Sequence, residues 1–211
     1  MICKQRTTTI AMKLKVFLMF FLTPFRVVFL IGAVSLMGGV SLAHAQVQVS
    51  MSSSNAVTVP AFVEKDLSAA RVVGQSRLTM YFFKIYDATL YAPFGQFDKT
   101  KPFALSLAYL RDFDGADIAQ RSIDEMQDLG YTDNAVLTRW RVQMEQAFPN
   151  IAKGDVLTGM VDEQQHTQFY FNGEATYKIS DPLFTQAFFA IWLDDNTSQP
   201  KMRKQLLGQS K

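Results

Sequence analysis

The sequence predicts an α+β domain in which helices cover one face of a large antiparallel sheet. Three observations support this class: strand-like segments follow one another through short turns, a pair of amphipathic helices interrupts them, and further helices end the chain. Strands joined by hairpins pair antiparallel, and the apolar face of such a sheet must be covered by another layer. The 211 residues contain no internal repeat.

The first 45 residues are expected to form a cleavable secretory signal peptide. They carry five Lys and Arg and no Asp or Glu, then an apolar run, then Ala43-His44-Ala45. Positive, apolar and small residues in this order are typical of an export signal, so we predict cleavage after Ala45 and a periplasmic location. The alternative is an uncleaved anchor, because residues 16–42 are long enough to span a bilayer, although Arg26 interrupts them. After cleavage no integral membrane segment is expected.

The exported chain is expected to begin with a flexible segment, residues 46–56, which is rich in Ser and Gln. Residues 57–63 are predicted to form an edge strand, where Pro60 is tolerated. Aromatic-rich strands follow over residues 72–82 and 83–91, and residues 103–110 alternate large and small side chains at period two. The large side chains of that last strand share one face: Phe103, Leu105, Leu107 and Tyr109.

The middle of the chain predicts two helices. Asp114 is placed to cap the first, which should end before Gly130. Asp133 is placed to cap the second, which Pro149 should stop. The first helix carries Ile118, Ser122, Met126 and Leu129 on one side, and the second carries Leu137, Trp140, Met144 and Phe148 at helical spacing.

The last part of the chain predicts three more strands and two closing helices. The strands are expected over residues 155–161, 167–171 and 175–179. Asn172-Gly173 is a strong hairpin signal between the second and the third. Asp181-Pro182 opens a helix with proline at its first position, and a short helix is expected over residues 200–207.

The composition excludes several classes of function. Beyond residue 45 the chain has three more acidic than basic residues and no basic stripe, which argues against nucleic-acid binding. The one cysteine, Cys3, lies in the predicted signal, so the exported domain has no disulfide, no thiol nucleophile and no cysteine metal site. His166, its sole histidine, is expected in a polar, solvated turn. No metal and no cofactor are predicted.

Two polar residues in apolar strands are the candidate ligand-binding groups. Arg77 and Tyr86 lie in the two consecutive aromatic-rich strands. A guanidinium and a phenol that converge in an apolar cavity would bind a carboxylate, the guanidinium by two parallel hydrogen bonds. The alternative is that Arg77 pairs with an acid such as Asp87 or Asp112 and that Tyr86 packs in the core.

Several short strings occur in the order and spacing of a known family. They are Val73-Gly74-Gln75-Ser76-Arg77, Lys84-Ile85-Tyr86-Asp87-Ala88-Thr89-Leu90-Tyr91, Asp114-Gly115, Gly154-Asp155, Phe171-Asn172-Gly173, Ile191-Trp192-Leu193 and Lys201-Met202-Arg203-Lys204-Gln205-Leu206-Leu207-Gly208. Together they resemble the chalcone isomerase-like domain over residues 57–208, and the bacterial exported branch of that family most closely.

The resemblance implies an open-faced β-sandwich, with a ligand cleft between a large antiparallel sheet and a layer of helices. Family members either cyclise a chalcone to a flavanone or bind fatty acids, and in the second group an Arg and a Tyr on neighbouring strands hold the carboxylate. Arg77 and Tyr86 fall on those two positions. The isomerases present a Tyr and an Asn on the first cleft helix, where this chain has Ile118 and Glu125. A Thr or Ser of a later helix is matched by Thr185.

We therefore expect a non-catalytic periplasmic protein that binds a fatty acid or a similar small amphipathic carboxylate. Arg77 and Tyr86 are expected to hold the head group, and Ile118, Thr185 and Phe188 to line the cleft. One alternative is an isomerase acting on a chalcone-like or enone substrate, with Arg77 as electrophile and Tyr86 as proton donor. Another is a structural protein of the cell envelope, which a closed and filled interior would favour.

Overall fold

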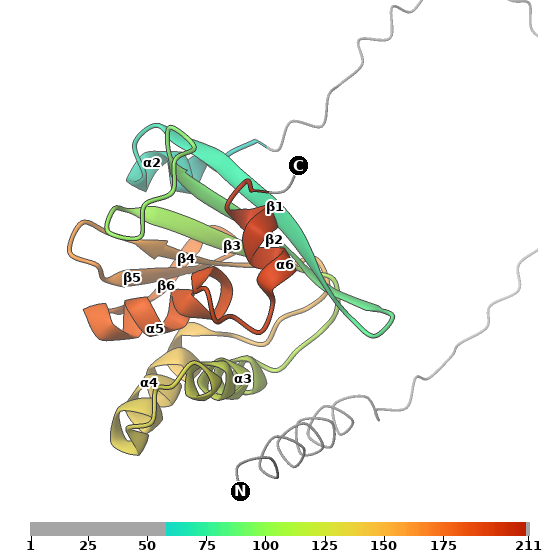
Figure 1. Ribbon diagram of the computed structural model, residues 1–211, viewed down its shortest axis with the longest axis vertical. Helices are drawn as coiled ribbons and strands as arrows, with labels where there is room; N and C mark the ends of the chain where they lie inside the picture. The colour runs from blue at the N-terminus through green and yellow to red at the C-terminus, as the bar shows by residue number, and fades with distance from the viewer. Residues whose placement is uncertain (1–57, 210–211) are drawn as a thin grey trace, which may run out of the picture. The chain divides into compact units, whose positions relative to one another are not determined.

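A computed structural model describes residues 58–209, which form an α+β fold of six strands and five helices (Figure 1). The predicted signal peptide, residues 1–45, and the predicted flexible segment, residues 46–56, lie outside the described residues. Within the described part of the chain, no helix has both the length and the apolar character needed to cross a bilayer.

A single six-stranded sheet organises the fold, and its strand order follows the chain. The strands are β1 (Ala70–Met80), β2 (Phe83–Pro93), β3 (Phe103–Tyr109), β4 (Val156–Val161), β5 (Thr167–Phe171) and β6 (Glu174–Ile179). Each strand pairs antiparallel with its neighbour in sequence, as the hairpin signals predict. The long β1–β2 hairpin therefore forms one end of the sheet, and β1 and β6 are its edges.

Four helices cover one face of the sheet. They are α3 (Gly115–Asp128), α4 (Asn134–Ala147), α5 (Pro182–Leu193) and α6 (Pro200–Leu206). Asp133 caps α4 by accepting the backbone N–H groups of Ala135 and Val136, and Asp181 caps α5 in the same way. The side chain of Asp114 makes no capping bond to α3, where the N–H of Gly115 donates to Asn150 Oδ1 instead.

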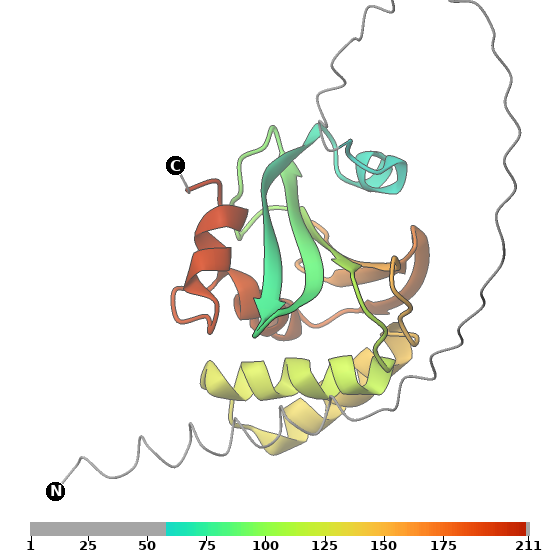
Figure 2. The same ribbon diagram turned by 90° about the vertical axis from the view of Figure 1, so that its right-hand side faces the viewer.

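The prediction of an edge strand over residues 57–63 is wrong, because the chain there forms the short helix α2 (Ala61–Asp66). Pro60 is the residue just before the helix, and its carbonyl accepts the N–H groups of Val63 and Glu64. Proline suits this position because it has no N–H to lose and its φ is already close to helical. Val63 is fully buried against the sheet face opposite α6, so α2 and α6 lie on opposite sides of the sheet (Figure 2).

The main core lies between the sheet and helices α3 to α6. The predicted inward face of β3 is confirmed, because Phe103, Leu105, Leu107 and Tyr109 all belong to this core. Phe188 of α5 lies at its centre, 5% exposed. It packs against the rings of Phe148, Phe169, Phe184, Phe189 and Trp192 at centroid distances of 5.2 to 6.1 Å.

The last helix packs directly on the first strand. A Cβ atom at Gly74 of β1 would lie only 2.1 Å from the backbone oxygen of Gln205 in α6, so only glycine allows this approach. Two residues further on, the hydroxyl of Ser76 donates to Gln205 Oε1 at 2.5 Å. Contacts between residues more than 120 positions apart therefore hold the two ends of the domain together.

Candidate functional site

Arg77 lies on the sheet face opposite the main core and forms an ion pair with Asp87. The two residues are direct cross-strand partners of β1 and β2. Arg77 Nε donates to Asp87 Oδ1 at 2.5 Å and Nη2 donates to Oδ2 at 2.7 Å, while the side chains stay 44% and 40% exposed. Exposed pairs of this kind contribute little to stability. The guanidinium that the sequence assigns to a ligand carboxylate is occupied by a carboxylate of the same hairpin.

Tyr86 points to the other side of the sheet, so the predicted convergence of Arg77 and Tyr86 is not found. Its cross-strand partner is Leu78, and both side chains pack against the main core. The physical reason is the alternation of side chains along a strand, since Tyr86 and Asp87 are consecutive and face opposite ways. The alternative prediction, that Arg77 pairs with Asp87, is the one confirmed.

The phenol of Tyr86 is held by a hydrogen bond inside the helix-covered face. Trp192 Nε1 donates to the Tyr86 oxygen at 3.0 Å, and the ring of Tyr109 lies edge-on, 5.7 Å between centroids. Burial raises the pKa of Tyr86 to about 12. Burial also raises the pKa of Tyr109. At neutral pH both phenols are therefore protonated, and Tyr86, whose oxygen accepts from Trp192, keeps its own proton to donate.

A buried carboxylate lies beside this phenol. Glu125 of α3 is only 7% exposed. Arg121 Nη2, one turn earlier on the helix, donates to Glu125 Oε1, and the Arg121 side chain is 55% exposed. Both charges act on Tyr86, because Glu125 raises the pKa of its phenol and Arg121 lowers it. We call Tyr86, Tyr109, Arg121, Glu125 and Trp192 the Tyr86 cluster.

Sequence reasoning found only part of this cluster. It singled out Tyr86 and placed Glu125 where the family's isomerases have an Asn, but it did not single out Arg121. The spacing of Arg121 and Glu125, four residues apart, signals an ion pair on a helix face. Nothing in that spacing indicates that the acid is buried, since burial depends on how α3 lies against the sheet.

The other predicted ligand contacts lie in packed surroundings. Thr185 is 3% exposed, and its hydroxyl bonds that of Thr167 at 2.8 Å. Phe188 is enclosed by aromatic rings, as described above. Ile118 is half-buried against the main core. The structure thus places Ile118, Thr185 and Phe188 on the helix layer that faces the sheet, with packed side chains around Thr185 and Phe188.

Two surface hollows lie elsewhere on the described residues. One, of about 180 Å³, is bordered by Leu129, Gly130, Tyr131, Ala190, Asp194 and Asn196. The other, of about 450 Å³, is bordered by Gln75, Ser76, Arg77, Asp87, Ala88 and Gln205. The second hollow includes Arg77 and is open to solvent, and five of its six bordering residues are polar or charged. Within residues 58–209, no group of His, Cys, Asp and Glu is arranged to hold a metal ion.

A family model described as chalcone isomerase-like matches residues 72–208. The chain belongs to the chalcone isomerase-like family. It is similar to an uncharacterized protein of Haemophilus influenzae, with 28% identity over 140 residues that cover 66% of this chain and 68% of that protein.

Among solved structures, this chalcone isomerase-like chain is similar to the fatty-acid binding protein AtFAP1 of Arabidopsis thaliana. The TM-score is 0.53 at 11% identity, and the match covers 67% of this chain and 88% of the plant protein. Similarity at this identity shows the fold alone, and it confirms the predicted architecture of an antiparallel sheet with a helical layer.

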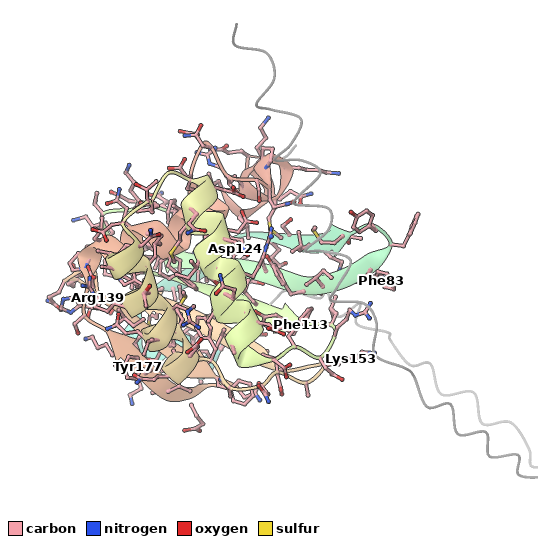
Figure 3. All side chains as sticks on the ribbon, turned by 90° about the horizontal axis from the view of Figure 1, so that it is seen from below. Phe83, Phe113, Asp124, Arg139, Lys153 and Tyr177 are labelled. Carbon is pink, nitrogen blue, oxygen red and sulfur yellow. The ribbon has the colours of Figure 1, made fainter. Side chains whose placement is uncertain are left out.

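The Tyr86 cluster combines three kinds of donor at one place in this chalcone isomerase-like fold. The indole of Trp192 donates to the phenol of Tyr86, and the Arg121–Glu125 pair of α3 lies near enough to shift the pKa of that phenol (Figure 3 shows α3 from its outer side, with Asp124 labelled, the residue before the buried Glu125). Hydrogen-bond donors in a partly desolvated environment bind an anion or a carbonyl oxygen more strongly than the same groups do in water. The arrangement is suited to holding the polar end of a largely apolar molecule.

Proposed function

We propose that this domain binds a fatty acid or a similar amphipathic carboxylate in the periplasm, without turning it over. The observation that carries the proposal is the Tyr86 cluster, a set of hydrogen-bond donors within the helix-covered apolar layer. The similarity in fold to a fatty-acid binding protein supports the ligand class.

In this proposal the head group binds Arg121 and Tyr86 rather than Arg77. Arg121 is 55% exposed and reaches the cluster from its solvent side, so an incoming carboxylate meets it first. The Tyr86 hydroxyl donates its proton to the second oxygen, because its own oxygen is already occupied by Trp192. Glu125 neutralises Arg121 in the free protein, and the ligand carboxylate replaces it as partner.

The acyl tail enters between α3 and the sheet. Ile118 and Tyr86 are the half-buried side chains at this border, and Phe113 packs edge-on against Tyr109 next to them. The filled interior means that α3 must shift outward to admit the tail. Each methylene that leaves water contributes ~0.8 kcal/mol, so a tail of about ten carbons supplies about 8 kcal/mol against the cost of this opening and of association.

The test is dodecanoate binding to the unit Ser52–Lys211, which is compact and has its own core. Native mass spectrometry shows whether a fatty acid co-purifies, and calorimetry gives the affinity. Tyr86→Phe removes one hydrogen bond, about 1 kcal/mol, and should weaken binding roughly 5-fold. Arg121→Gln removes a charge-assisted bond and should weaken it at least ~10-fold. Glu125→Gln should tighten binding, because it removes a competing carboxylate.

Two matched variants separate this site from general charge effects. Arg141→Gln breaks an Arg–Glu pair of the same spacing on α4, with Glu145, and should leave the affinity unchanged. Arg77→Gln breaks the outer pair with Asp87 and should also leave it unchanged. If Arg77→Gln lost binding while Arg121→Gln kept it, the head group would bind Arg77, as expected from the sequence, and not Arg121.

A protein that neither carries nor takes up a fatty acid would reject the proposed function altogether. The location is tested separately, by fractionating the producing cells and sequencing the N-terminus of the periplasmic form. The expected first residue is Gln46. A full-length chain recovered with the membranes would instead support the uncleaved anchor.

A further inference from the structure

The turn of the β1–β2 hairpin exposes three consecutive aromatic residues. Tyr81 is 62% exposed, Phe82 95% and Phe83 42%. The hairpin extends past the ends of the other strands, so this tip stands clear of the domain (Figures 1 and 3). Apolar side chains gathered on such a projection are a liability in water and commonly mark an interaction site.

The tip is also built from residues that do not favour the turn. Met80 and Phe83 are cross-strand partners, so Tyr81 and Phe82 form a two-residue loop. Tyr81 has φ +57°, a conformation that glycine or asparagine adopts far more readily than a bulky residue. Because neither folding nor solubility favours aromatic residues here, the tip is better explained by a function than by its contribution to the hairpin.

Basic side chains lie directly behind the aromatic tip. Lys84 is exposed, and the Arg111 guanidinium lies over the ring of Phe83, 4.5 Å from its centroid. Residues 79–86 contain no acid. Arg77 neutralises Asp87, and Asp112, which accepts the backbone N–H of Lys153, is an uncompensated acid set against the cations Lys84 and Arg111. The tip is thus locally cationic on a domain whose net charge beyond residue 45 is acidic.

We propose that this tip is an anchor for an anionic bilayer surface. Phe82 inserts at the boundary between head groups and acyl chains, and Tyr81 lies at the level of the head groups, where aromatic rings are favoured. Lys84 and Arg111 then contact lipid phosphates, an attraction that acts within about a Debye length of the surface.

The size and shape of the tip favour a bilayer over a protein partner. A stable protein interface buries about 800 Å² on each side, which the side chains of one two-residue turn do not supply. A projecting group of aromatic residues with cations behind it fits a membrane interface instead, where the rings lie among the head groups and the cations lie next to the lipid phosphates. One such anchor gives weak, reversible binding, which suits a protein that visits a membrane. This inference does not depend on the Tyr86 cluster or on its ligand.

The test is flotation of Ser52–Lys211 with vesicles of phosphatidylcholine, with and without phosphatidylglycerol. This unit has its own core, and it lacks the apolar N-terminal residues that would bind vesicles themselves. We expect binding to the anionic vesicles that decreases with salt. Phe82→Ser should reduce the partition coefficient at least ~10-fold, because it removes the aromatic side chain that inserts into the bilayer. Lys84→Glu should reduce it about 5-fold or more.

The chain offers a matched control for each change. Phe94 is 71% exposed, also has positive φ, and lies at the opposite end of β2, so Phe94→Ser should bind as the wild type does. Lys99→Glu alters an exposed lysine in the loop after β2, so about ten residues of extended strand, roughly 30 Å and beyond a Debye length, separate it from the tip. It should likewise leave binding within about 2-fold. Circular dichroism checks that every variant is folded. A wild-type unit that does not float with anionic vesicles, or an equal loss in Phe82→Ser and Phe94→Ser, overturns the proposal.

Discussion

Replacing Phe188 by alanine measures whether α5 packs on the sheet as firmly as the structure indicates. Phe188 is 5% exposed, and its ring touches Phe169 of β5 as well as Phe148 and its neighbours on α5. A Phe→Ala change in a core costs about 3–5 kcal/mol, and less where the surroundings collapse into the space. Because the surrounding groups are stiff rings, we expect a loss in the upper half of this range.

Urea unfolding followed by the fluorescence of Trp140 and Trp192 gives the free energy of unfolding. Domains of this size are stable by about 5–15 kcal/mol, so the expected loss is a large fraction of the total and lowers the midpoint strongly. Phe94→Ala, at a ring that is 71% exposed, is the matched control and should change stability by no more than about 0.5 kcal/mol. A loss below about 1 kcal/mol in Phe188→Ala would refute the packed interior and return Phe188 to the wall of an open cleft.

Three further predictions follow from the same packing. Gly74→Ala should cost about 2–3 kcal/mol and make the C-terminal helix sensitive to protease, because the new Cβ overlaps backbone atoms of α6; full protection would contradict this. Asp181→Ala should lower the free energy of unfolding by about 2–4 kcal/mol, because Asp181 caps α5 and also accepts a hydrogen bond from buried Trp140 at 2.9 Å. Asp133→Ala, which removes a helix cap alone, should lower it by about 1 kcal/mol. Burial raises the pKa of Asp181, but hydrogen bonds from Trp140 and the helix N-terminus outweigh it, so the pKa is lower than that of a free Asp. The stability that Asp181 contributes is therefore present above pH about 4 and is lost as the pH falls below that, which urea unfolding at a series of pH values measures. Burial raises the pKa of Tyr86 to about 12, so stability should fall as pH rises from about 10 toward 12, and less steeply in Tyr86→Phe; parallel profiles would count against a buried phenol.

Much of the fold could be predicted from local signals. Asp133 and Asp181 each mark a helix start with a side chain that bonds the first free N–H groups, and Asn172-Gly173 supplies the positive φ values of a tight hairpin. These signals act within a few residues, so the sequence displays them directly. Helix α2 could not be found in this way. Only Phe62 and Val63 are β-like in type, whereas Glu64, Lys65 and Asp66 disfavour a strand. The packing of Phe62 on Tyr170, on a strand far along the chain, is a contact that the local sequence does not display.

The candidate site was harder to predict because it depends on register. Arg77 and Tyr86 share neighbouring strands, but a side chain faces one side or the other according to an odd or even position counted from the turn at Tyr81-Phe82. The register shift between Leu78 and Thr79 changes that count by one, and no residue type announces it. The burial of Glu125 likewise depends on the angle of α3 against the sheet, which is a property of the whole packed layer.

The contact of α6 with Gly74 also constrains the order in which the molecule can be completed. A ribosome releases the chain from its N-terminus, and any membrane channel that threads it does the same. Strand β1 therefore emerges early, and its packing partner in α6 comes last of all the described elements. Until about residue 206 is free, one surface of β1 has no cover. The sheet and the helices before α6 can pack earlier, but the docking of α6 on β1 has to be the last step of folding.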